Sequence, residues 1–329
     1  MHISDNLAAP CLLVAAMLIL ILFQSALYQA GGAIYPEPEG QEAESEAGCI
    51  SLNGVRYVPD RFFALSVAAN VCAFLLPGII YVKFKSAGHS KKLKFGFPKP
   101  QYLPLCLYMV LLLFSGTVLI NALLFCFGQS DFGVSGVLPL VFQTGGNAAY
   151  DMGVLTGFVL LPAVCEEFFF RSVIAAEYEK HGAFCACALS ALGFAISHFS
   201  LKFLPSYIFA AIIFYVLAKI TNSVFFAMFL HMGYNFFCIY LADKFLGALN
   251  FEQNRAMFVF VVAIIFIVCM FFVLNALEGI YYKKADANEP SPESAGQNGQ
   301  KNAAAKFLAS LASPTFIAAI VIFFVYINI

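Results

Sequence analysis

The sequence predicts an all-α, polytopic transmembrane bundle of about nine spanning helices. Of the 329 residues, 61% are hydrophobic and only 11% are charged, whereas soluble domains usually carry about 25% charged residues. Apolar runs approaching the roughly 20 residues that cross a bilayer recur along the whole chain. The protein is therefore expected to lie in lipid, and its net charge of −1 gives no basis for nucleic-acid binding.

Nine segments are predicted to span the membrane. They cover residues 8–28, 62–82, 102–127, 153–175, 183–199, 203–219, 222–242, 257–277 and 312–328. The fifth and sixth are short, and only a turn around Leu201 and Lys202 separates them. The first has no Lys or Arg before Leu12 and continues to Tyr28. Because this run is longer than a typical signal-peptide core, we expect it to remain as an anchor.

The basic residues between these segments predict the orientation of the bundle. A cytoplasmic N-terminus assigns thirteen Lys and Arg residues to the inner side and five to the outer side. Cytoplasmic loops carry the excess of basic residues, so this orientation is favoured and the C-terminus lies outside. Residues 36–48 are acidic and predict a disordered outer loop, whereas residues 285–305 predict a flexible inner linker.

Polar residues within the predicted spans are concentrated in three helices. A charged side chain at the bilayer centre costs about 2.5–3.5 kcal/mol on insertion scales, so such residues are functional candidates. The first, second, third, sixth, eighth and ninth spans contain no acidic residue and no His. The exceptions in the fourth, fifth and seventh spans are Glu166, Glu167, Arg171, His198, His231 and Asn235. We expect these three helices to bring them into one cavity.

The spacing of these residues predicts which of them face one another. Glu167 and Arg171 are four residues apart, so they share a helix face and can pair. Glu166 lies about 100° around the helix from Glu167, so its carboxylate faces elsewhere. His231 and Asn235 are also four residues apart and point the same way.

Two kinds of chemistry fit this set of side chains. A Glu beside a His can activate water as a general base, and a second His with an Asn can donate hydrogen bonds to a developing oxyanion. This set suffices for peptide hydrolysis without a covalent intermediate. Alternatively, Glu166, His198 and His231 form the ligand set of a catalytic zinc with a fourth position for water. The residues alone leave both schemes open.

Three motifs together resemble the signature of the CPBP family, which contains the type II CAAX prenyl endopeptidases and the bacterial Abi or bacteriocin-processing proteins. The motifs are Glu166-Glu167-x-x-x-Arg171, Phe194-x-x-x-His198 and His231-x-x-x-Asn235. Their order and their placement in apolar helices agree with the family over about residues 150–245. No resemblance extends over the first hundred residues or beyond the seventh helix.

The resemblance implies an intramembrane endopeptidase and a role for each matching residue. Glu166 would activate water with the help of His198, while His231 and Asn235 would stabilise the oxyanion. The supporting residues would be Glu167, Arg171 and Phe194. No cofactor is firmly predicted, and zinc remains an alternative. The substrate would be a membrane-associated peptide or lipidated protein, and in the prenyl endopeptidases the cavity opens to the cytoplasm.

The sequence also predicts a division of the chain into three regions, and it leaves two other functions open. Residues 101–245 would form the peptidase core of four to five helices, between two-helix regions at residues 1–100 and 246–329. We expect a bacterial cytoplasmic membrane as the location. A non-enzymatic bacteriocin-immunity or scaffold protein that retains the fold is one alternative, and a transporter or metal-ion carrier is another.

The depth of the predicted site residues raises one geometric difficulty. In upright helices, Glu166 and His231 lie near the middle of the membrane, but His198 lies close to the outer end of a short helix. The site closes only if this fifth helix is tilted, displaced or longer than predicted, or if one crossing is misplaced.

Overall fold

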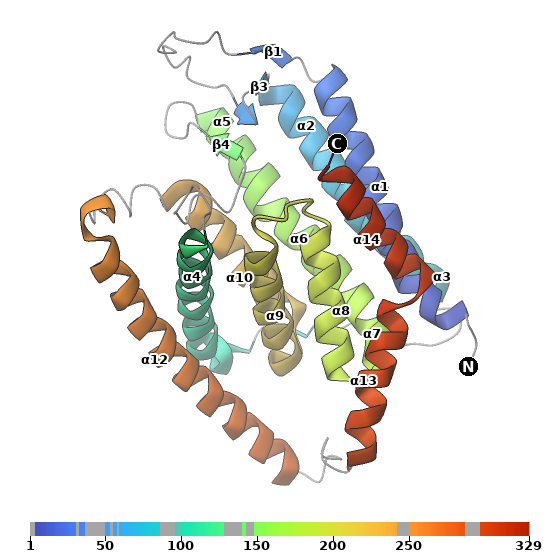
Figure 1. Ribbon diagram of the computed structural model, residues 1–329, viewed down its shortest axis with the longest axis vertical. Coiled ribbons are helices and arrows are strands. Elements are labelled where there is room, and N and C mark those ends of the chain that lie inside the picture. Colours follow the sequence, from blue (N-terminus) through green and yellow to red (C-terminus); the bar gives the residue numbers. More distant parts are fainter. Residues whose placement is uncertain are drawn as a thin grey trace.

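The computed structural model is a bundle of apolar helices with a small sheet at one end (Figure 1). It describes residues 4–30, 33–36, 50–52, 55–57, 59–85, 96–97, 99–127, 140–142, 148–241, 251–286 and 297–328. The first half contains α1 (Ser4–Ala30), α2 (Pro59–Asn70), η1 (Val71–Leu75), α3 (Leu76–Lys85), η2 (Pro100–Tyr102) and α4 (Leu103–Cys126).

The helices of the second half include the predicted core and the C-terminal region. One long, composite helix consists of α5 (Ala148–Val154), η4 (Leu155–Leu160), α6 (Leu161–Glu167), η5 (Phe168–Ile174), α7 (Ala175–Tyr178) and η6 (Glu179–His181). The later helices are α8 (Ala183–Ile196), α9 (Leu204–Thr221), α10 (Val224–Phe236), η7 (Phe237–Leu241), α12 (Phe251–Asp286), α13 (Gln297–Leu311) and α14 (Pro314–Tyr326).

The helices confirm the predicted class of polytopic membrane protein. Within the described residues, seven helices are long and apolar enough to span a membrane, or eight if α13 and α14, bent by 59°, form one span. Of the about nine predicted spans, α8 is the one that this length criterion leaves out. Helix α8 has 14 residues, which at about 1.5 Å per residue gives about 21 Å, less than a hydrocarbon core of about 30 Å.

Four short strands form a sheet that the sequence analysis did not predict. They are β1 (Ala33–Pro36), β2 (Ile50–Leu52), β3 (Val55–Tyr57) and β4 (Leu140–Phe142), in the antiparallel order β1-β3-β2-β4. Strands of three or four residues are too short for an alternating apolar pattern to be recognised. The acidic segment 37–48 between β1 and β2 lies outside the described residues, so its predicted disorder stays a prediction.

The predicted inner linker is partly helical. Helix α12 extends to Asp286 and α13 begins at Gln297, so the prediction of a flexible segment is wrong for residues 297–305. The run Ala303-Ala304-Ala305 has high helix propensity, which the loop-like composition of the preceding residues obscured. Residues 287–296 lie outside the part of the chain that can be described.

Helices from all three predicted regions share one hydrophobic core. Helix α4 packs along α12, α8 packs along α9, and α1 packs beside α14 (Figure 1). A single cluster of buried side chains includes residues of α1, α4, α6, α8, α9, α10, α12 and α14. Within this cluster, four large side chains are fully buried in or beside the composite helix. They are Phe169, Phe170, Phe194 and Phe214.

A glycine turn makes a hairpin of the composite helix and α8. Gly182 has φ 106° and ψ 160°, a conformation that an L-residue avoids. The composite helix descends to this turn and α8 returns beside it. Residues at about equal separation from Gly182 are therefore brought to similar depths, as Phe170 and Phe194 show with ring centroids 5.3 Å apart. This symmetry determines which residues of the two helices meet.

Candidate active site

A cavity of about 180 Å³ lies between the composite helix and α8, α9 and α10. This volume is several times the space that one water molecule needs. The residues that line the cavity are Asn70, Phe158, Pro162, Glu166, Phe194, His198, Tyr207, Ala210, Phe214, His231, Tyr234, Asn235 and Cys238. Five of the seven predicted site residues are among them, and the other two, Glu167 and Arg171, lie directly behind the wall.

The hairpin at Gly182 brings Glu166 and His198 together. Glu166 is sixteen residues before Gly182 and His198 sixteen residues after it, and the Oε2 atom of Glu166 lies 3.8 Å from Nε2 of His198. His198 follows the end of α8 in a turn at the depth of Glu166, so the difficulty over depth is resolved by a short, displaced helix.

The hydrogen bond at the other ring nitrogen determines the tautomer of His198. Its Nδ1 lies 2.8 Å from the carbonyl oxygen of Phe194. A carbonyl oxygen only accepts hydrogen bonds, so Nδ1 carries the proton and donates it. In the neutral ring, Nε2 is then an acceptor that faces Glu166. Two acceptors at 3.8 Å are bridged most simply by a donor that bonds to both, and water is such a donor.

The carboxylate of Glu166 has room for that donor. Glu166 is 7% exposed, and within the described part of the chain its Oε2 atom is buried without a hydrogen-bond partner. A buried polar atom without a partner is costly, so such an atom usually contacts water or a ligand. The orphaned oxygen therefore marks the position in the cavity where a water molecule fits best.

Aromatic rings hold the imidazole of His198 in place. The ring of Tyr207 stacks on it with centroids 4.2 Å apart and an interplanar angle of 29°. Phe194, one helical turn earlier, contacts it at 4.6 Å between centroids. The imidazole thus lies against both rings and keeps its Nε2 atom directed towards Glu166.

Behind the cavity, Glu167 joins His231 to Arg171. The Oε1 atom of Glu167 accepts a hydrogen bond from Nδ1 of His231 at 3.1 Å, and Oε2 lies 3.0 Å from Nε of Arg171. This confirms the predicted pairing of Glu167 with Arg171. Arg171 also donates to Ser190 Oγ at 3.2 Å, and Ser190 donates to the carbonyl oxygen of Phe170 at 2.9 Å.

This chain of contacts is buried and packed between aromatic rings. Glu167 is 0% exposed and Arg171 is 6% exposed. The guanidinium carbon of Arg171 lies 5.2 Å from the centroid of Phe194 and 5.7 Å from that of Phe214, which is cation–π geometry. Phe214 also stacks on the ring of His231 at 4.7 Å and 17°. His231 is thus oriented by a carboxylate on one side and an aromatic face on another.

Asn235 completes the lining one helical turn above His231. It is half-buried and lines the cavity together with Tyr234. The hydroxyl of Tyr234 donates to Thr117 Oγ1 at 3.1 Å, and Thr117 donates to the carbonyl of Leu113 at 2.9 Å. Helix α4 therefore helps to hold the part of α10 that carries the third motif.

Several residues that shape the site were not predicted from the sequence. They are Asn70, Tyr207, Phe214, Ser190 and Tyr234. Tyr and Phe in apolar helices give no signal in a sequence already rich in aromatics. Ser190 is eight residues after Gly182, whereas Arg171 is eleven residues before it, so the symmetry of the hairpin does not place their contact and a lone Ser in an apolar helix gives no signal.

The residues present do not fit the alternative of a zinc site. In the described residues, no three His, Cys, Asp or Glu side chains form a group that could hold a metal ion. The Nδ1 contacts of His231 with Glu167 and of His198 with Phe194 are of a kind that metal-bound imidazoles also make. Only the lack of a close grouping of the side chains therefore argues against the zinc alternative, and we derive no step through a metal.

The fold and the site define an integral membrane protein of helical type with a carboxylate–imidazole cavity. Residues 148–237 match the model of a family described as type II CAAX prenyl endopeptidase Rce1-like. This match contains all three motifs and confirms the resemblance predicted from them. It covers less than a third of the chain, and the matched family is a family of proteases. Neither the curated proteins nor the solved structures yielded a match.

Proposed function

We propose that the protein is an intramembrane endopeptidase that hydrolyses a peptide bond of a membrane-associated substrate. The observation that carries this proposal is the pair formed by Glu166 and His198. A buried carboxylate oxygen that has no hydrogen-bond partner among the described residues faces an imidazole nitrogen that is an acceptor in the neutral ring. A water molecule that donates to both atoms would be held and polarised as a nucleophile.

The proposed reaction begins with this water. Its oxygen attacks the carbonyl carbon of the substrate while its proton passes to the carboxylate of Glu166. The carbonyl π bond opens, and the electron pair moves to the carbonyl oxygen to form a tetrahedral oxyanion. The C–N bond then breaks, and Glu166 returns the proton to the leaving nitrogen. The products are a carboxylic acid and an amine, and Glu166 is ionised again.

His231 and Asn235 are proposed to stabilise the oxyanion. The side-chain amide of Asn235 is a donor in its ordinary form. His231 already uses Nδ1 to donate to Glu167, so its Nε2 donates only when the ring is an imidazolium. The carboxylate of Glu167 stabilises that charged ring, and Arg171 holds Glu167 in position. Hydrogen bonds that strengthen as the oxyanion forms lower the activation free energy.

The proposed orientation places the N-terminus in the cytoplasm and the C-terminus outside. It rests on the basic residues of the predicted loops and their flanks, of which thirteen fall on the inner side and five on the outer side. Residues 101–245 would supply the peptidase core, since every cavity-lining residue except Asn70 lies in this range. A lipidated substrate is one member of the proposed substrate class.

A comparison of membrane peptides tests the proposal. Cells that express Glu166→Gln should accumulate at least one uncut membrane polypeptide that is processed in wild-type cells. The matched control is Glu278→Gln, because Glu278 is exposed on α12 outside the cavity. If the two variants give the same peptides at equal protein levels, the non-enzymatic scaffold function is favoured over the peptidase.

A further inference from the structure

We infer that the cavity is approached from the end of the bundle that carries the strands, and that this end faces away from the cytoplasm. The substrate is then a peptide segment in the outer half of the membrane or just outside it. This inference rests on the proposed function and narrows its substrate class. It differs from the cytoplasmic opening that the family resemblance implies.

The cavity extends in one direction from the level of Glu166 and His231. On the composite helix its lining residues are Phe158, Pro162 and Glu166, all at or before Glu166. On α10 and η7, the lining residues begin at His231 and continue to Cys238. The composite helix begins, and η7 ends, at the end of the bundle where β4 and the other strands lie (Figure 1). Both helices thus place the cavity in the strand half.

Packed side chains close the cavity on its other side. Directly below Glu166 and His231 lie the buried contacts of Glu167 with Arg171 and of Arg171 with Ser190. Phe170 is 0% exposed and contacts Phe194 at 5.3 Å between ring centroids. This buried layer lies between the opposite end of the bundle and the carboxylate of Glu166.

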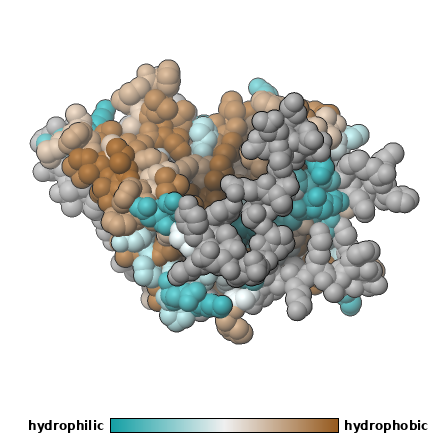
Figure 2. Space-filling view, turned by 90° about the horizontal axis from the view of Figure 1, so that it is seen from below, coloured by the Kyte–Doolittle hydropathy of each residue, from teal (hydrophilic) through white to brown (hydrophobic). Residues whose placement is uncertain are grey.

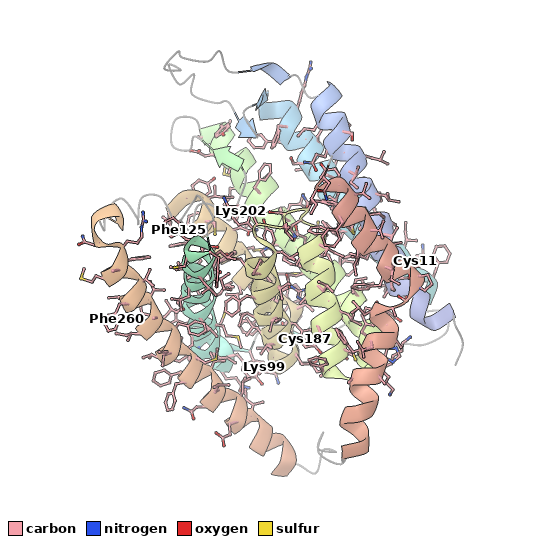
Figure 3. The ribbon with its side chains drawn as sticks, viewed as in Figure 1. Cys11, Lys99, Phe125, Cys187, Lys202 and Phe260 are labelled. Atoms are coloured by element: carbon pink, nitrogen blue, oxygen red, sulfur yellow. The ribbon has the colours of Figure 1, made fainter. Side chains whose placement is uncertain are left out.

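The distribution of basic residues distinguishes the two ends. Among the described residues, and without the buried Arg171, nine Lys residues lie at the end opposite to the strands, whereas four Lys and Arg residues lie at the strand end. Figure 3 labels Lys99 and Cys187 near the former end and Lys202 nearer to the strands, by the turn between α8 and α9. Figure 2, viewed from the end opposite to the strands, shows groups of hydrophilic residues there. The excess of basic residues favours the cytoplasm for this end.

The lining of the cavity suits an apolar peptide. Its walls include the rings of Phe158, Tyr207, Phe214 and Tyr234, and the only carboxylate among the lining residues is Glu166. A segment with uncharged side chains could bring its backbone to Glu166 without burying a second charge, which is costly in a low-dielectric site. We therefore expect the cleaved bond near the outer end of a membrane span.

The native Cys238 provides a test of access. It lines the strand half of the cavity and is a free thiol. A full-length variant would keep Cys238 as its single cysteine, and a second would carry only Lys180→Cys, because Lys180 is exposed at the opposite end. Right-side-out and inverted vesicles would be treated with a charged, membrane-impermeant methanethiosulfonate. Unreacted thiols would then be counted by mass-tagging after denaturation.

We expect Cys238 to react at least fivefold faster in right-side-out vesicles, and the cysteine at position 180 to show the opposite preference. Faster reaction of Cys238 in inverted vesicles, or its protection in both preparations, would overturn the inference. An epitope inserted after Gly40 with all native cysteines retained gives a second measurement. Added protease should remove it from right-side-out vesicles, and removal from inverted vesicles alone would contradict the orientation.

These measurements do not require catalysis. The labelling pattern should be the same when Glu166→Gln is added to the single-cysteine variant. A failure of the sidedness test with intact cleavage would therefore remove only the inference about access. The expected sidedness without any Glu166-dependent cleavage would remove the proposed function.

Discussion

Nδ1 of His231 lies 3.1 Å from Oε1 of Glu167, and both side chains are buried. The two residues are 64 positions apart in the sequence, so the contact joins α10 to the composite helix behind the cavity. The carboxylate accepts this hydrogen bond and orients the imidazole. Arg171 lies on the far side of Glu167, so the three side chains form a buried row of ionisable groups.

The contact predicts that Glu167→Gln lowers activity through His231. An amide can still accept a hydrogen bond from Nδ1, but it cannot stabilise an imidazolium as a carboxylate does. We expect the cleavage rate per molecule to fall about 10²-fold, as when an oxyanion donor is removed. The measurement is turnover normalised to folded protein in the membrane. A rate within twofold of wild type would mean that His231 acts as a neutral ring.

The same row predicts a non-additive effect on stability. Arg171→Met leaves the buried carboxylate of Glu167 without its strongest partner, and breaking one side of a buried pair costs about 3–5 kcal/mol. The double variant Glu167→Gln, Arg171→Met removes both charges and should recover most of that free energy while remaining inactive. Detergent-resistance melting curves of the two single variants and the double variant check this. Additive losses would show that the two side chains are energetically independent.

The stack on His198 predicts a difference between two substitutions of Tyr207. Tyr207→Phe keeps the ring that packs on the imidazole at 4.2 Å, so it should retain activity within about threefold, or about 0.7 kcal/mol of activation free energy. Tyr207→Ala removes the ring and should lower the rate about tenfold or more, because His198 can then rotate away from Glu166. Equal losses in both variants would assign the role to the hydroxyl instead.

The turn at Gly182 predicts an effect at a distance. Among the described residues other than its chain neighbours, none has an atom within 4 Å of the position that a Cβ would take, so Gly182→Ala is opposed by the backbone conformation alone, at about 1–3 kcal/mol. Relief of this strain would shift α8 against the composite helix and separate His198 from Glu166. We expect lower activity and a lower melting temperature.

Gly279→Ala is the matched control for this change. Gly279 also has open space around its Cβ position but lies within α12, where alanine favours the helix. This variant should be active and at least as stable as wild type. If Gly182→Ala behaves like Gly279→Ala, the turn does not determine the register of the hairpin.

The sequence predicted the helices well because lipid requires long apolar runs that few other folds contain. It also predicted the pairing of Glu167 with Arg171, since their spacing alone places them on one helix face. The contact of Glu166 with His198 was harder to place, because it depends on a hairpin whose second arm is too short to span the membrane. The symmetric distance of both residues from Gly182 would have revealed it.

The remaining features of the site depend on packing between distant helices. Nothing in the sequence around Tyr207 or Phe214 indicates that these rings stack on His198 and His231, because apolar helices here contain many aromatic residues. The contact of Tyr234 with Thr117 joins α10 to α4 and has no local signal. The short strands were missed for a different reason, since three-residue pairings arise from the proximity of helix ends.

The central claim is that Glu166 and His198 hold and activate a water molecule. Its most direct test is the cleavage rate of the purified proteins in liposomes, with the substrate found by the membrane-peptide comparison. Glu166→Gln and His198→Ala should each lower the rate at least about 10²-fold, as expected for the loss of a general base, while melting curves stay close to wild type. A folded Glu166→Gln protein that cleaves within twofold of the wild-type rate would contradict the claim.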